Sequence, residues 1–392
     1  FKVNIKNGIA DSSFGNNGFV DLHTGLGTNS SSLFVTMTSP GVIYKNLIIV
    51  GSSVSEGNPA AKGNIRAFDA NTGDLKWSFN TIPEIGEDGH ETYSDPDAYK
   101  RLGGANAWSG LTLDEERGIL YAPTGSVSYD FYGGDRVGDN LFANSIIALS
   151  AETGNKIWHF QTVHHDVWDR DLPAPPILFD YSMNDSIIPS LAQVTKSGYI
   201  YLLNRITGKP LYKIIERPVP SKSNLEGEVL SKTQPIPTFP DPFSRQSLTK
   251  NDINSFVIER ERDSLIKIFT SLLKDDIFSP PSEEGTLIFP GFDGGAEWGG
   301  PALDPINNKL FINSNEMPWI LTMKKVSNTD SQGMNIYNKQ CLMCHGIDYK
   351  GSGENPSILD LSSKYNFDEL RSLVINGKGL MPGFKFLDDQ KI

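Results

Sequence analysis

Long hydrophobic runs and an excess of positive charge are both missing from this sequence. The longest apolar stretches, such as 47–50, suit buried strands and fall far short of the roughly 18 residues of a membrane helix. Lys and Arg number 35 against 47 Asp and Glu, which gives a formal net charge of −12. This balance argues against nucleic acid as a partner. We therefore expect neither a membrane helix nor a nucleic-acid-binding surface in these residues.

Two sequence signatures are also missing. No G-x-G-x-x-G follows a strand-like segment, so a nicotinamide dinucleotide site has no support. The first residues, 1–6, lack the charged region, the apolar stretch and the cleavage site of a secretion signal. Both ends of the chain look cut, so a signal upstream of Phe1 stays open.

The composition is that of a folded protein. Hydrophobic residues make up 38% and charged residues 21% of the 392 residues, which excludes bulk disorder and leaves enough apolar side chains for a large core. The length allows two or three domains, or one long all-β domain that takes most of the chain.

The two cysteines stand together in the segment 341–345, which reads C-L-M-C-H. This spacing is the attachment signature of a c-type haem. Two thiols one helical turn apart can each bond a haem vinyl group, so we expect Cys341 and Cys344 to hold the haem and His345 to face its iron. A structural zinc site and a redox dithiol remain alternatives, although no second Cys/His pair follows at zinc-finger spacing.

A haem of this kind needs a second axial ligand, usually Met or His. Met381 stands downstream in the segment G-K-G-L-M-P, and an ordinary core methionine is the alternative interpretation. The segment 331–392 resembles the class I cytochrome c family, in which a helix precedes the haem motif, here over 333–340. The resemblance implies that His345 and Met381 are the two iron ligands.

The same family has a second helix before the loop methionine, which we expect over 367–376. Pro356 falls where the family has a proline beside the iron-ligating histidine. A last helix should follow the methionine, yet the chain stops at Ile392, so we expect the C-terminus to be truncated or poorly packed.

Two segments nearer the start of the chain align without gaps, 67–77 (AFDANTGDLKW) and 148–158 (ALSAETGNKIW). Each reads as a strand, a Thr-Gly turn and a second strand, with Trp at a fixed distance after the glycine. A weaker copy at 202–212 has Tyr in place of Trp. Self-similar β units predict a propeller whose blades pack on one another, and chance hairpins are the alternative.

Other alternating segments, such as 118–122 and 309–313, predict further strands. Helical periodicity is scarce before residue 252. The stretch 216–281 is richer in Pro, Ser and charge, and we expect an irregular excursion there with a short helix near 253–273.

The repeats and their surroundings, over about 5–325, resemble the dehydrogenases that depend on pyrroloquinoline quinone (PQQ), and most closely their membrane-type glucose and quinate branch. That family folds as an eight-bladed propeller, and too few blades are visible here to close the ring. We therefore predict a partial all-β propeller over 1–325, followed by a small all-α cytochrome c domain over 331–392. Further blades would precede Phe1 and follow the cytochrome.

The segment 161–173 (QTVHHDVWDRDLP) gathers three acids, two histidines and a tryptophan directly after the second repeat. Such groups are costly to bury, so their concentration beside a core strand predicts a functional site, with a solvated turn as the alternative. The resemblance implies that Asp169 is the catalytic base for a substrate hydroxyl. Asp171 is a second candidate, and an acid at this place helps to bind a lanthanide in some relatives.

The resemblance also implies a metal ion beside PQQ, because a cation polarises the carbonyl that receives hydride. Ca²⁺ prefers oxygen ligands, and Glu56 matches the carboxylate ligand of the family, with Asp169 as a second ligand. Ser126 stands where alcohol dehydrogenases of the family have an Asn ligand, so the third ligand stays open.

Five further residues match positions that contact PQQ in the family. Lys196 matches the basic residue that the family places on the reactive quinone oxygens, where a cation stabilises the reduced ring, and a solvated lysine in a turn is the alternative. Trp108 matches the tryptophan that stacks on the cofactor plane, unless it is a blade-core residue. Thr38, Ser53 and Trp298 match other polar or aromatic contacts.

Together these features imply a periplasmic quinohaemoprotein dehydrogenase for a small hydroxylated substrate, whether alcohol, polyol or sugar. Electrons would pass to the haem and then to a cytochrome or the respiratory quinone pool, and membrane association through segments outside this chain stays open. A non-catalytic propeller scaffold and a plain electron carrier are the alternatives. A scaffold has no reason to hold Glu56, Asp169 and Lys196 together.

Overall fold

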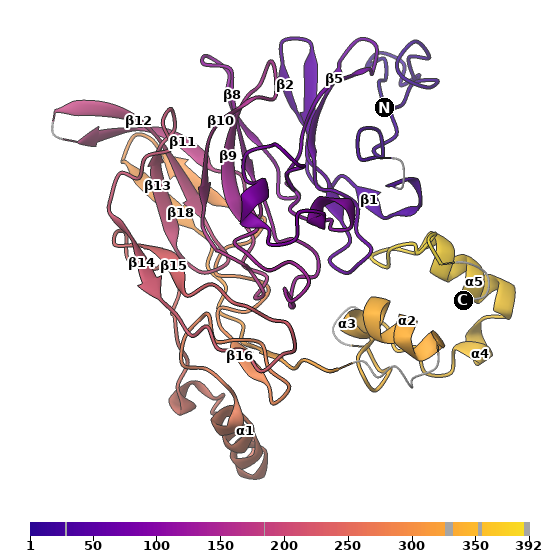
Figure 1. Ribbon diagram of the computed structural model, residues 1–392, viewed down its shortest axis with the longest axis vertical. Coiled ribbons are helices and arrows are strands. Elements are labelled where there is room, and N and C mark those ends of the chain that lie inside the picture. The colour runs from indigo at the N-terminus through magenta and orange to yellow at the C-terminus, as the bar shows by residue number, and fades with distance from the viewer. Residues whose placement is uncertain (28–29, 184, 326–331, 352–354, 388–392) are drawn as a thin grey trace.

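The computed structural model describes residues 1–27, 30–183, 185–325, 332–351 and 355–387. Within these residues the chain forms a series of small antiparallel sheets, followed by a group of short helices. Figure 1 shows the first three of the larger sheets standing side by side in chain order, while the strands of residues 301–312 lie beside the third of them; the C-terminal helices gather near β1 (Val35–Thr36).

The first two sheets have four strands each. One has the order β2-β3-β5-β6 and the other the order β10-β9-β8-β7. In the first, the strands are β2 (Val42–Tyr44), β3 (Leu47–Val50), β5 (Ile65–Asp69) and β6 (Leu75–Phe79). In the second, they are β7 (Thr112–Asp114), β8 (Ile119–Pro123), β9 (Ser145–Ser150) and β10 (Lys156–Gln161).

The later sheets are smaller. The third has the order β11-β12-β13, with strands β11 (Ile177–Met183), β12 (Ser186–Val194) and β13 (Ile200–Asn204). The remaining pairs are β14 (Ile214–Pro218) with β15 (Thr233–Pro237), β16 (Thr286–Ile288) with β19 (Trp319–Leu321), β17 (Pro301–Asp304) with β18 (Lys309–Ile312), and β1 (Val35–Thr36) with β4 (Ser53–Val54).

The core lies between consecutive sheets, because successive side chains of a strand point to opposite faces. On β9, Ile147 and Leu149 pack in the cluster shared with the first sheet. Their neighbours Ile146 and Ala148 pack in the cluster shared with the third sheet. A central strand buried on both faces is what a propeller blade requires, and the predicted all-β propeller is consistent with this packing.

The repeats that align in the sequence hold neighbouring sheets together. The indole Nε1 of Trp77 donates to the carbonyl oxygen of Ala151 over 3.3 Å, and Trp158 Nε1 donates to Arg205 O over 3.1 Å. The glycine of each following repeat lies against the same ring. A Cβ at Gly154 would come within 2.5 Å of Trp77, and one at Gly208 within 2.6 Å of Trp158. Each repeat therefore binds to the turn of the next.

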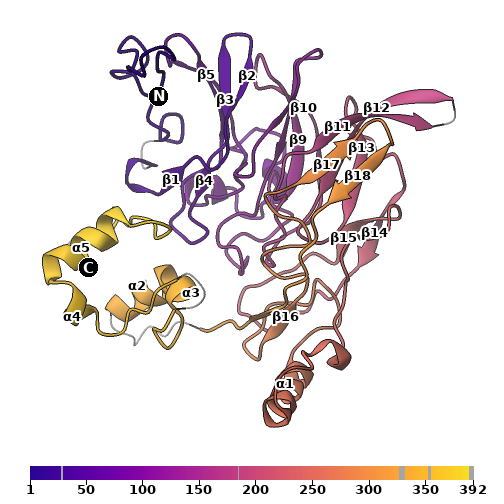
Figure 2. The ribbon, with the colours of Figure 1, turned by 180° about the vertical axis from the view of Figure 1, so that it is seen from behind.

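The helices lie outside this strand series. Helix α1 (Glu259–Ser271) falls within the helix predicted near 253–273, and Figure 2 shows it projecting from the sheets. The strands β14 and β15 lie at the start of the stretch 216–281, which the sequence predicted to be irregular. One-turn 3₁₀ helices lie at Ser30–Ser32, His90–Thr92, Ala98–Lys100 and Lys250–Asp252.

The C-terminal helices are α2 (Gln332–Gln340), α3 (Leu342–His345), α4 (Leu361–Lys364) and α5 (Phe367–Asn376). Both helices predicted on either side of the haem motif are therefore present as α2 and α5. Within the domain predicted over 331–392, residues 331, 352–354 and 388–392 lie outside the described residues. No helix within the described ranges combines the length and the apolar character needed to cross a bilayer.

Candidate active site and haem segment

One cavity of about 230 Å³ gathers most of the residues that the sequence pointed to. Six predicted site residues line it: Ser53, Glu56, Trp108, Asp169, Lys196 and Trp298. They come from segments on or next to β4, β7, β10, β12 and β17, so loops of successive sheets meet at one place. The remaining lining residues are Val54, Ser55, Asn106, Ser126, Ser128, Asp130, Asp171 and Glu297.

Asp169 and Lys196 form a buried ion pair at this cavity. The ammonium Nζ lies 2.9 and 3.0 Å from the two carboxylate oxygens, and the side chains are only 15% and 8% exposed. Burial raises the pKa of the Asp169 carboxyl, and the positive charge of Lys196 opposes this rise. Burial alone would lower the pKa of Lys196, but the surrounding carboxylates outweigh it and raise the pKa. The lysine is thus a buried cation and no solvated turn residue.

The backbone around Asp169 is held by its neighbours in the acid-rich loop. The Asp166 carboxylate accepts the N–H of Trp168 at 2.9 Å and of Arg170 at 2.7 Å. Trp168 is fully buried, and its indole donates to the carbonyl oxygen of Ser279 at 2.8 Å. Asp169 lies between these anchors with a φ of 56°, a left-handed conformation that aspartate tolerates better than most residues. The hydrogen bonds of the residues on either side therefore fix the orientation of the Asp169 carboxylate.

The histidines of the same loop lie outside the cavity. His165 Nε2 lies 2.7 Å from Glu228 Oε1, and both side chains are almost completely buried. His164 contacts Gln161 Oε1 at 2.6 Å and Glu216 Oε1 at 3.3 Å. The polar residues of the loop 161–173 therefore hold the loop against its neighbours as well as lining the cavity.

Asp171 fixes the cavity wall. Its carboxylate accepts the indole N–H of Trp108 at 2.7 Å and the Ser126 N–H at 2.8 Å, and the Ser126 hydroxyl lies 3.1 Å away. The tryptophan ring is therefore held in a fixed orientation beside the cavity. Thr38 is exposed and does not line the cavity; its hydroxyl donates to the Trp108 carbonyl oxygen at 2.8 Å.

The cavity holds more negative than positive charge. Burial raises the pKa of Asp130, and nearby carboxylates raise it further. Desolvation by the surrounding protein also raises the pKa of Glu56; the positive charge of Lys196 opposes this rise, and the negative charge of Asp171 adds to it. Oxygen donors with excess negative charge suit a hard cation such as Ca²⁺. Even so, the described residues contain no group of three or more His, Cys, Asp or Glu arranged to hold a metal ion.

The haem-motif segment has almost no core of its own. Within its described part only His345 and Phe384 are buried, while Met343 is 56% and Leu380 80% exposed. The His345 ring Nδ1 lies 2.9 Å from the Pro356 carbonyl oxygen, which leaves the other ring nitrogen for a ligand. Apolar side chains around two free thiols and a buried imidazole fit a haem, which would fill the missing core.

The haem motif also approaches the acidic cavity. Gln340, one residue before the motif, donates from Nε2 to the Asn58 carbonyl oxygen at 2.5 Å. Desolvation by the surrounding protein, and then the negative charge of Glu56, raise the pKa of the Cys344 thiol. The loop that carries Glu56 therefore also contacts the helical segment.

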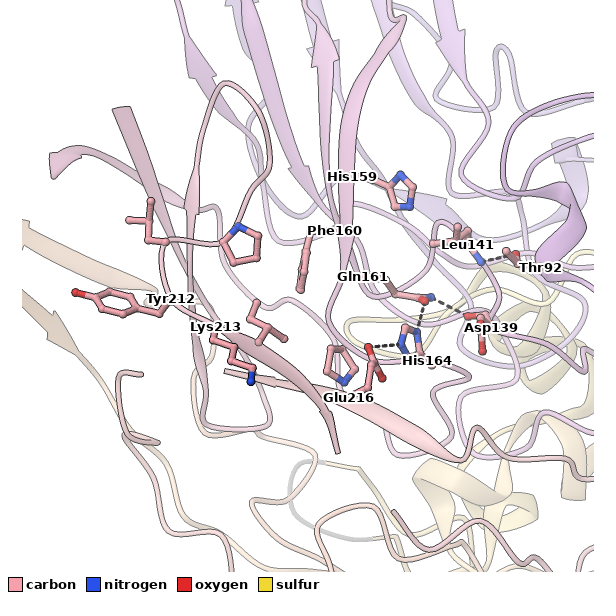
Figure 3. Close-up of a pocket in the computed structure, with 14 residues that line it drawn as sticks. Thr92, Asp139, Leu141, His159, Phe160, Gln161, His164, Tyr212, Lys213 and Glu216 are labelled. Atoms are coloured by element: carbon pink, nitrogen blue, oxygen red, sulfur yellow. Dashed lines mark hydrogen bonds and ion pairs between the residues drawn. The ribbon is translucent and has the colours of Figure 1, made fainter. Parts of the chain in front are cut away.

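A second and larger space, of about 730 Å³, lies between β10 and β14 (Figure 3). In Figure 3, His164 lies between Gln161 and Glu216, and the Gln161 amide contacts the Asp139 backbone. None of the predicted site residues lines this space. The smaller cavity is the better candidate because it brings buried charges together.

Comparison with known proteins shows two family matches. Residues 1–351 match the model described as glucose/ethanol/alcohol dehydrogenase, beta-propeller domain, of the PQQ type. Residues 328–392 match the model described as cytochrome C oxidase, cbb3-type, subunit III. The predicted fold, a propeller followed by a cytochrome c domain, is thereby confirmed. The matches overlap over 328–351, so the exact boundary between 325 and 331 stays a prediction.

Several curated proteins are similar over most of this chain. The quinate/shikimate dehydrogenase (quinone) of Acinetobacter baylyi is 36% identical over 329 residues, covering 82% of this chain and 40% of the relative. The quinoprotein glucose dehydrogenase of Escherichia coli is 32% identical, with 81% and 39% covered. The chain thus spans about two fifths of the length of these relatives.

A solved structure supports the fold. The quinohemoprotein alcohol dehydrogenase from Comamonas testosteroni superposes with a TM-score of 0.55 at 23% identity, covering 80% of this chain and 41% of that one. At this identity the likeness concerns the fold alone.

Proposed function

Because the chain belongs to the PQQ β-propeller family of glucose, ethanol and alcohol dehydrogenases, we propose that it oxidises the CH–OH group of a small alcohol, polyol or sugar. The observation that carries the proposal is the buried Asp169–Lys196 pair, in a cavity that also holds Glu56 and Trp108. When bound, PQQ supplies the acceptor for the two electrons removed from the substrate carbon, and a c-type haem supplies a one-electron carrier.

The residues of the chain have distinct roles in this proposal. Asp169 takes the hydroxyl proton of the substrate, and the positive charge of Lys196 favours the ionised form of that carboxylate against the effect of burial. Trp108, held by its bond to Asp171, offers a flat face for a planar ring. Ser53 and Trp298 line the same cavity as further contacts, and Thr38 acts from outside through the Trp108 backbone.

We assign the metal to Ca²⁺. Glu56 and Asp169 are the protein carboxylate ligands, and Ser126, which lines the cavity, is the candidate third donor. The oxygens of Asp171 already accept hydrogen bonds from Trp108 and Ser126, which favours Ca²⁺ over a lanthanide that would use this acid.

The haem is held by Cys341 and Cys344, with His345 and Met381 as iron ligands. Electrons leave for a cytochrome or the respiratory quinone pool, and the word quinone in the name of the Acinetobacter baylyi relative supports the second acceptor. We locate the protein in the periplasm, where c-type haem and PQQ enzymes meet their acceptors.

A substrate screen tests the function. The intact protein, reconstituted with PQQ and Ca²⁺, should reduce an artificial electron acceptor with at least one alcohol, polyol, sugar or quinate. Asp169→Asn should lower kcat by about 10²- to 10⁴-fold because the amide cannot accept the hydroxyl proton. Asp263→Asn, an exposed acid on α1, is the matched control and should leave the rate unchanged. Equal rates for the two variants would contradict the role of Asp169.

A further inference from the structure

One buried pair of titratable side chains has no part in the proposed mechanism. His165 Nε2 lies 2.7 Å from Glu228 Oε1, and the two side chains are 1% and 0% exposed. His165 belongs to the acid-rich loop 161–173, and Glu228 belongs to the loop 219–232 between β14 and β15. Charged groups are costly to bury, so their complete burial needs an explanation in the structure around them.

Two of the segments that line the cavity meet at this pair. Segment 128–139 contributes Ser128 and Asp130 to the cavity wall, and the acid-rich loop contributes Asp169 and Asp171. Neither segment forms a strand at these residues. Contacts outside the sheets must therefore fix the distance between the two parts of the wall.

Glu228 and His165 make these contacts. Glu228 Oε2 accepts the N–H of Gly133 at 2.7 Å, while its Oε1 faces the ring of His165. On the other side of the ring, Nδ1 lies 2.8 Å from the carbonyl oxygen of Gly138. The fit is tight, since a Cβ at Gly133 would come within 2.3 Å of His165 Nε2. The imidazole of the acid-rich loop is thus fastened to segment 128–139, directly and through Glu228.

The backbone at His165 depends on such contacts. Its φ is 46°, in the left-handed region that residues other than glycine adopt rarely, and such strain persists only where the surroundings hold it. The next residue is tied to the same segment, since Arg136 Nη2 donates to the Asp166 carbonyl oxygen at 2.6 Å. The Asp166 carboxylate in turn holds the N–H groups on either side of Asp169. A shift at His165 would therefore pass to the Asp169 carboxylate.

The geometry fixes which atoms of the pair carry hydrogen. A carbonyl oxygen can only accept, so His165 Nδ1 donates to Gly138. One further hydrogen lies between Nε2 and Glu228 Oε1, because two bare acceptors 2.7 Å apart would repel each other. A glutamine side chain offers the same connections, since its oxygen can accept from Gly133 and its amide N–H can donate to an Nε2 without hydrogen. An alanine side chain offers neither.

We propose that Glu228 is a positioning residue that holds, through the His165 ring, the loop of Asp169 in place at the cavity. This inference rests on the proposed dehydrogenase function. Glu228 does not line the cavity, so it acts only through the imidazole. The loop 219–232 contributes no lining residue either, and its part in the reaction is to support the active site from behind.

The first test is kinetic and uses the intact protein loaded with PQQ and Ca²⁺, with an artificial electron acceptor. Glu228→Ala should lower kcat by roughly 10- to 100-fold and leave KM unchanged, because a small misplacement of a reacting group is costly. Glu228→Gln should keep most of the wild-type kcat, since it preserves the contacts. Gly133→Ala should reproduce the loss from the other side, because its methyl group would displace the His165 ring.

Glu226→Ala is the matched control. Glu226 lies on the same loop, is 83% exposed and forms an ion pair with Lys325, so its loss should leave kcat unchanged. All rates are referred to the folded fraction of each protein, measured by urea unfolding. A merely structural role would lower the stability of Glu228→Ala but leave the kcat of its folded molecules at the wild-type value.

A second test needs no activity. Amide hydrogen exchange of the intact apoprotein, followed by mass spectrometry, reports how firmly each segment is held. Exchange should become faster in segment 128–139 and in the loop 161–173 in Glu228→Ala. It should stay at the wild-type rate in Glu228→Gln and in Glu226→Ala.

The outcomes separate the two proposals. An inactive wild type overturns the proposed function, and the exchange rates then decide whether Glu228 holds the loop. With an active wild type, the positioning role is overturned if folded Glu228→Ala keeps the wild-type kcat, or if Glu228→Gln loses as much as Glu228→Ala. Unchanged exchange of the loop 161–173 in Glu228→Ala overturns it as well.

Discussion

At the scale of single residues, the contact between repeats depends on glycine. Gly154 has a φ of 73°, and a Cβ there would come within 2.5 Å of the Trp77 ring, which is part of the adjoining sheet. Gly154→Ala should therefore lower the free energy of unfolding by about 1–3 kcal/mol beyond the left-handed strain. Gly86→Ala is the matched control, since Gly86 has a φ of 89° with nothing within 4 Å of the added Cβ. Urea unfolding of the three proteins measures the difference, and equal losses would contradict the packing role.

The candidate site was only partly readable from the sequence. Asp169 stood out because its loop is rich in acids, and Glu56 and Lys196 because they match positions of the family. The partners of these residues carry no such signal. Asp171 bonds Trp108 across 63 positions, and Lys196 approaches Glu297 across 101, so neither pair shows in any local pattern. The one available hint was that Glu297 directly precedes a predicted cofactor contact.

At the scale of elements, the two further strands predicted from alternation are both present, one buried on both faces and one exposed at every second residue. The segments 118–122 and 309–313 became β8 and β18 within one residue at each end. The sequence analysis did not predict the strands β14 and β15, because the prolines at 218, 235 and 237 are typical of a loop. Proline is tolerated there because each strand of a two-stranded sheet is an edge.

A strand also explains a pH effect on stability. His159, on β10, packs its ring edge-on to Phe142 at 4.9 Å, and burial, with the nearby charge of Lys156, lowers its pKa to about 4. The unfolded chain binds the proton near pH 6.5, so this site favours unfolding increasingly as pH falls from about 6.5 to 4.

His159→Phe should remove this dependence. The wild type should lose about 2 kcal/mol from this site between pH 7 and pH 4.5, allowing for the part of the ring that faces water, and the variant should lose correspondingly less. Urea unfolding at the two pH values provides the measurement. If the variant loses as much free energy of unfolding between pH 7 and pH 4.5 as the wild type does, then His159 binds its proton in the folded protein as readily as in the unfolded chain.

At the scale of the whole molecule, the fold was readable because its repeats are. Two Thr-Gly-Trp segments and one C-x-x-C-H were enough to predict a propeller and a cytochrome c segment. How the two meet was not readable, since the contact of Gln340 with the Asn58 carbonyl joins positions 282 residues apart. That contact places the haem motif beside the loop of Glu56, so electrons leaving the cavity would have a short way to go.

The haem should decide whether the C-terminal segment folds. The helices α4 and α5 bury none of their described residues, so this segment lacks the apolar core that usually pays for ordering a chain. Cys341→Ser combined with Cys344→Ser should abolish the haem stain after denaturing electrophoresis and expose 332–387 to rapid proteolysis, while the sheets stay resistant.

Met381→Ala should keep the haem stain and the protection from protease, but it should lose methionine ligation and lower the haem potential. If the double cysteine variant resists protease as well as the wild type does, the segment folds without haem, and the haem is not needed for its core.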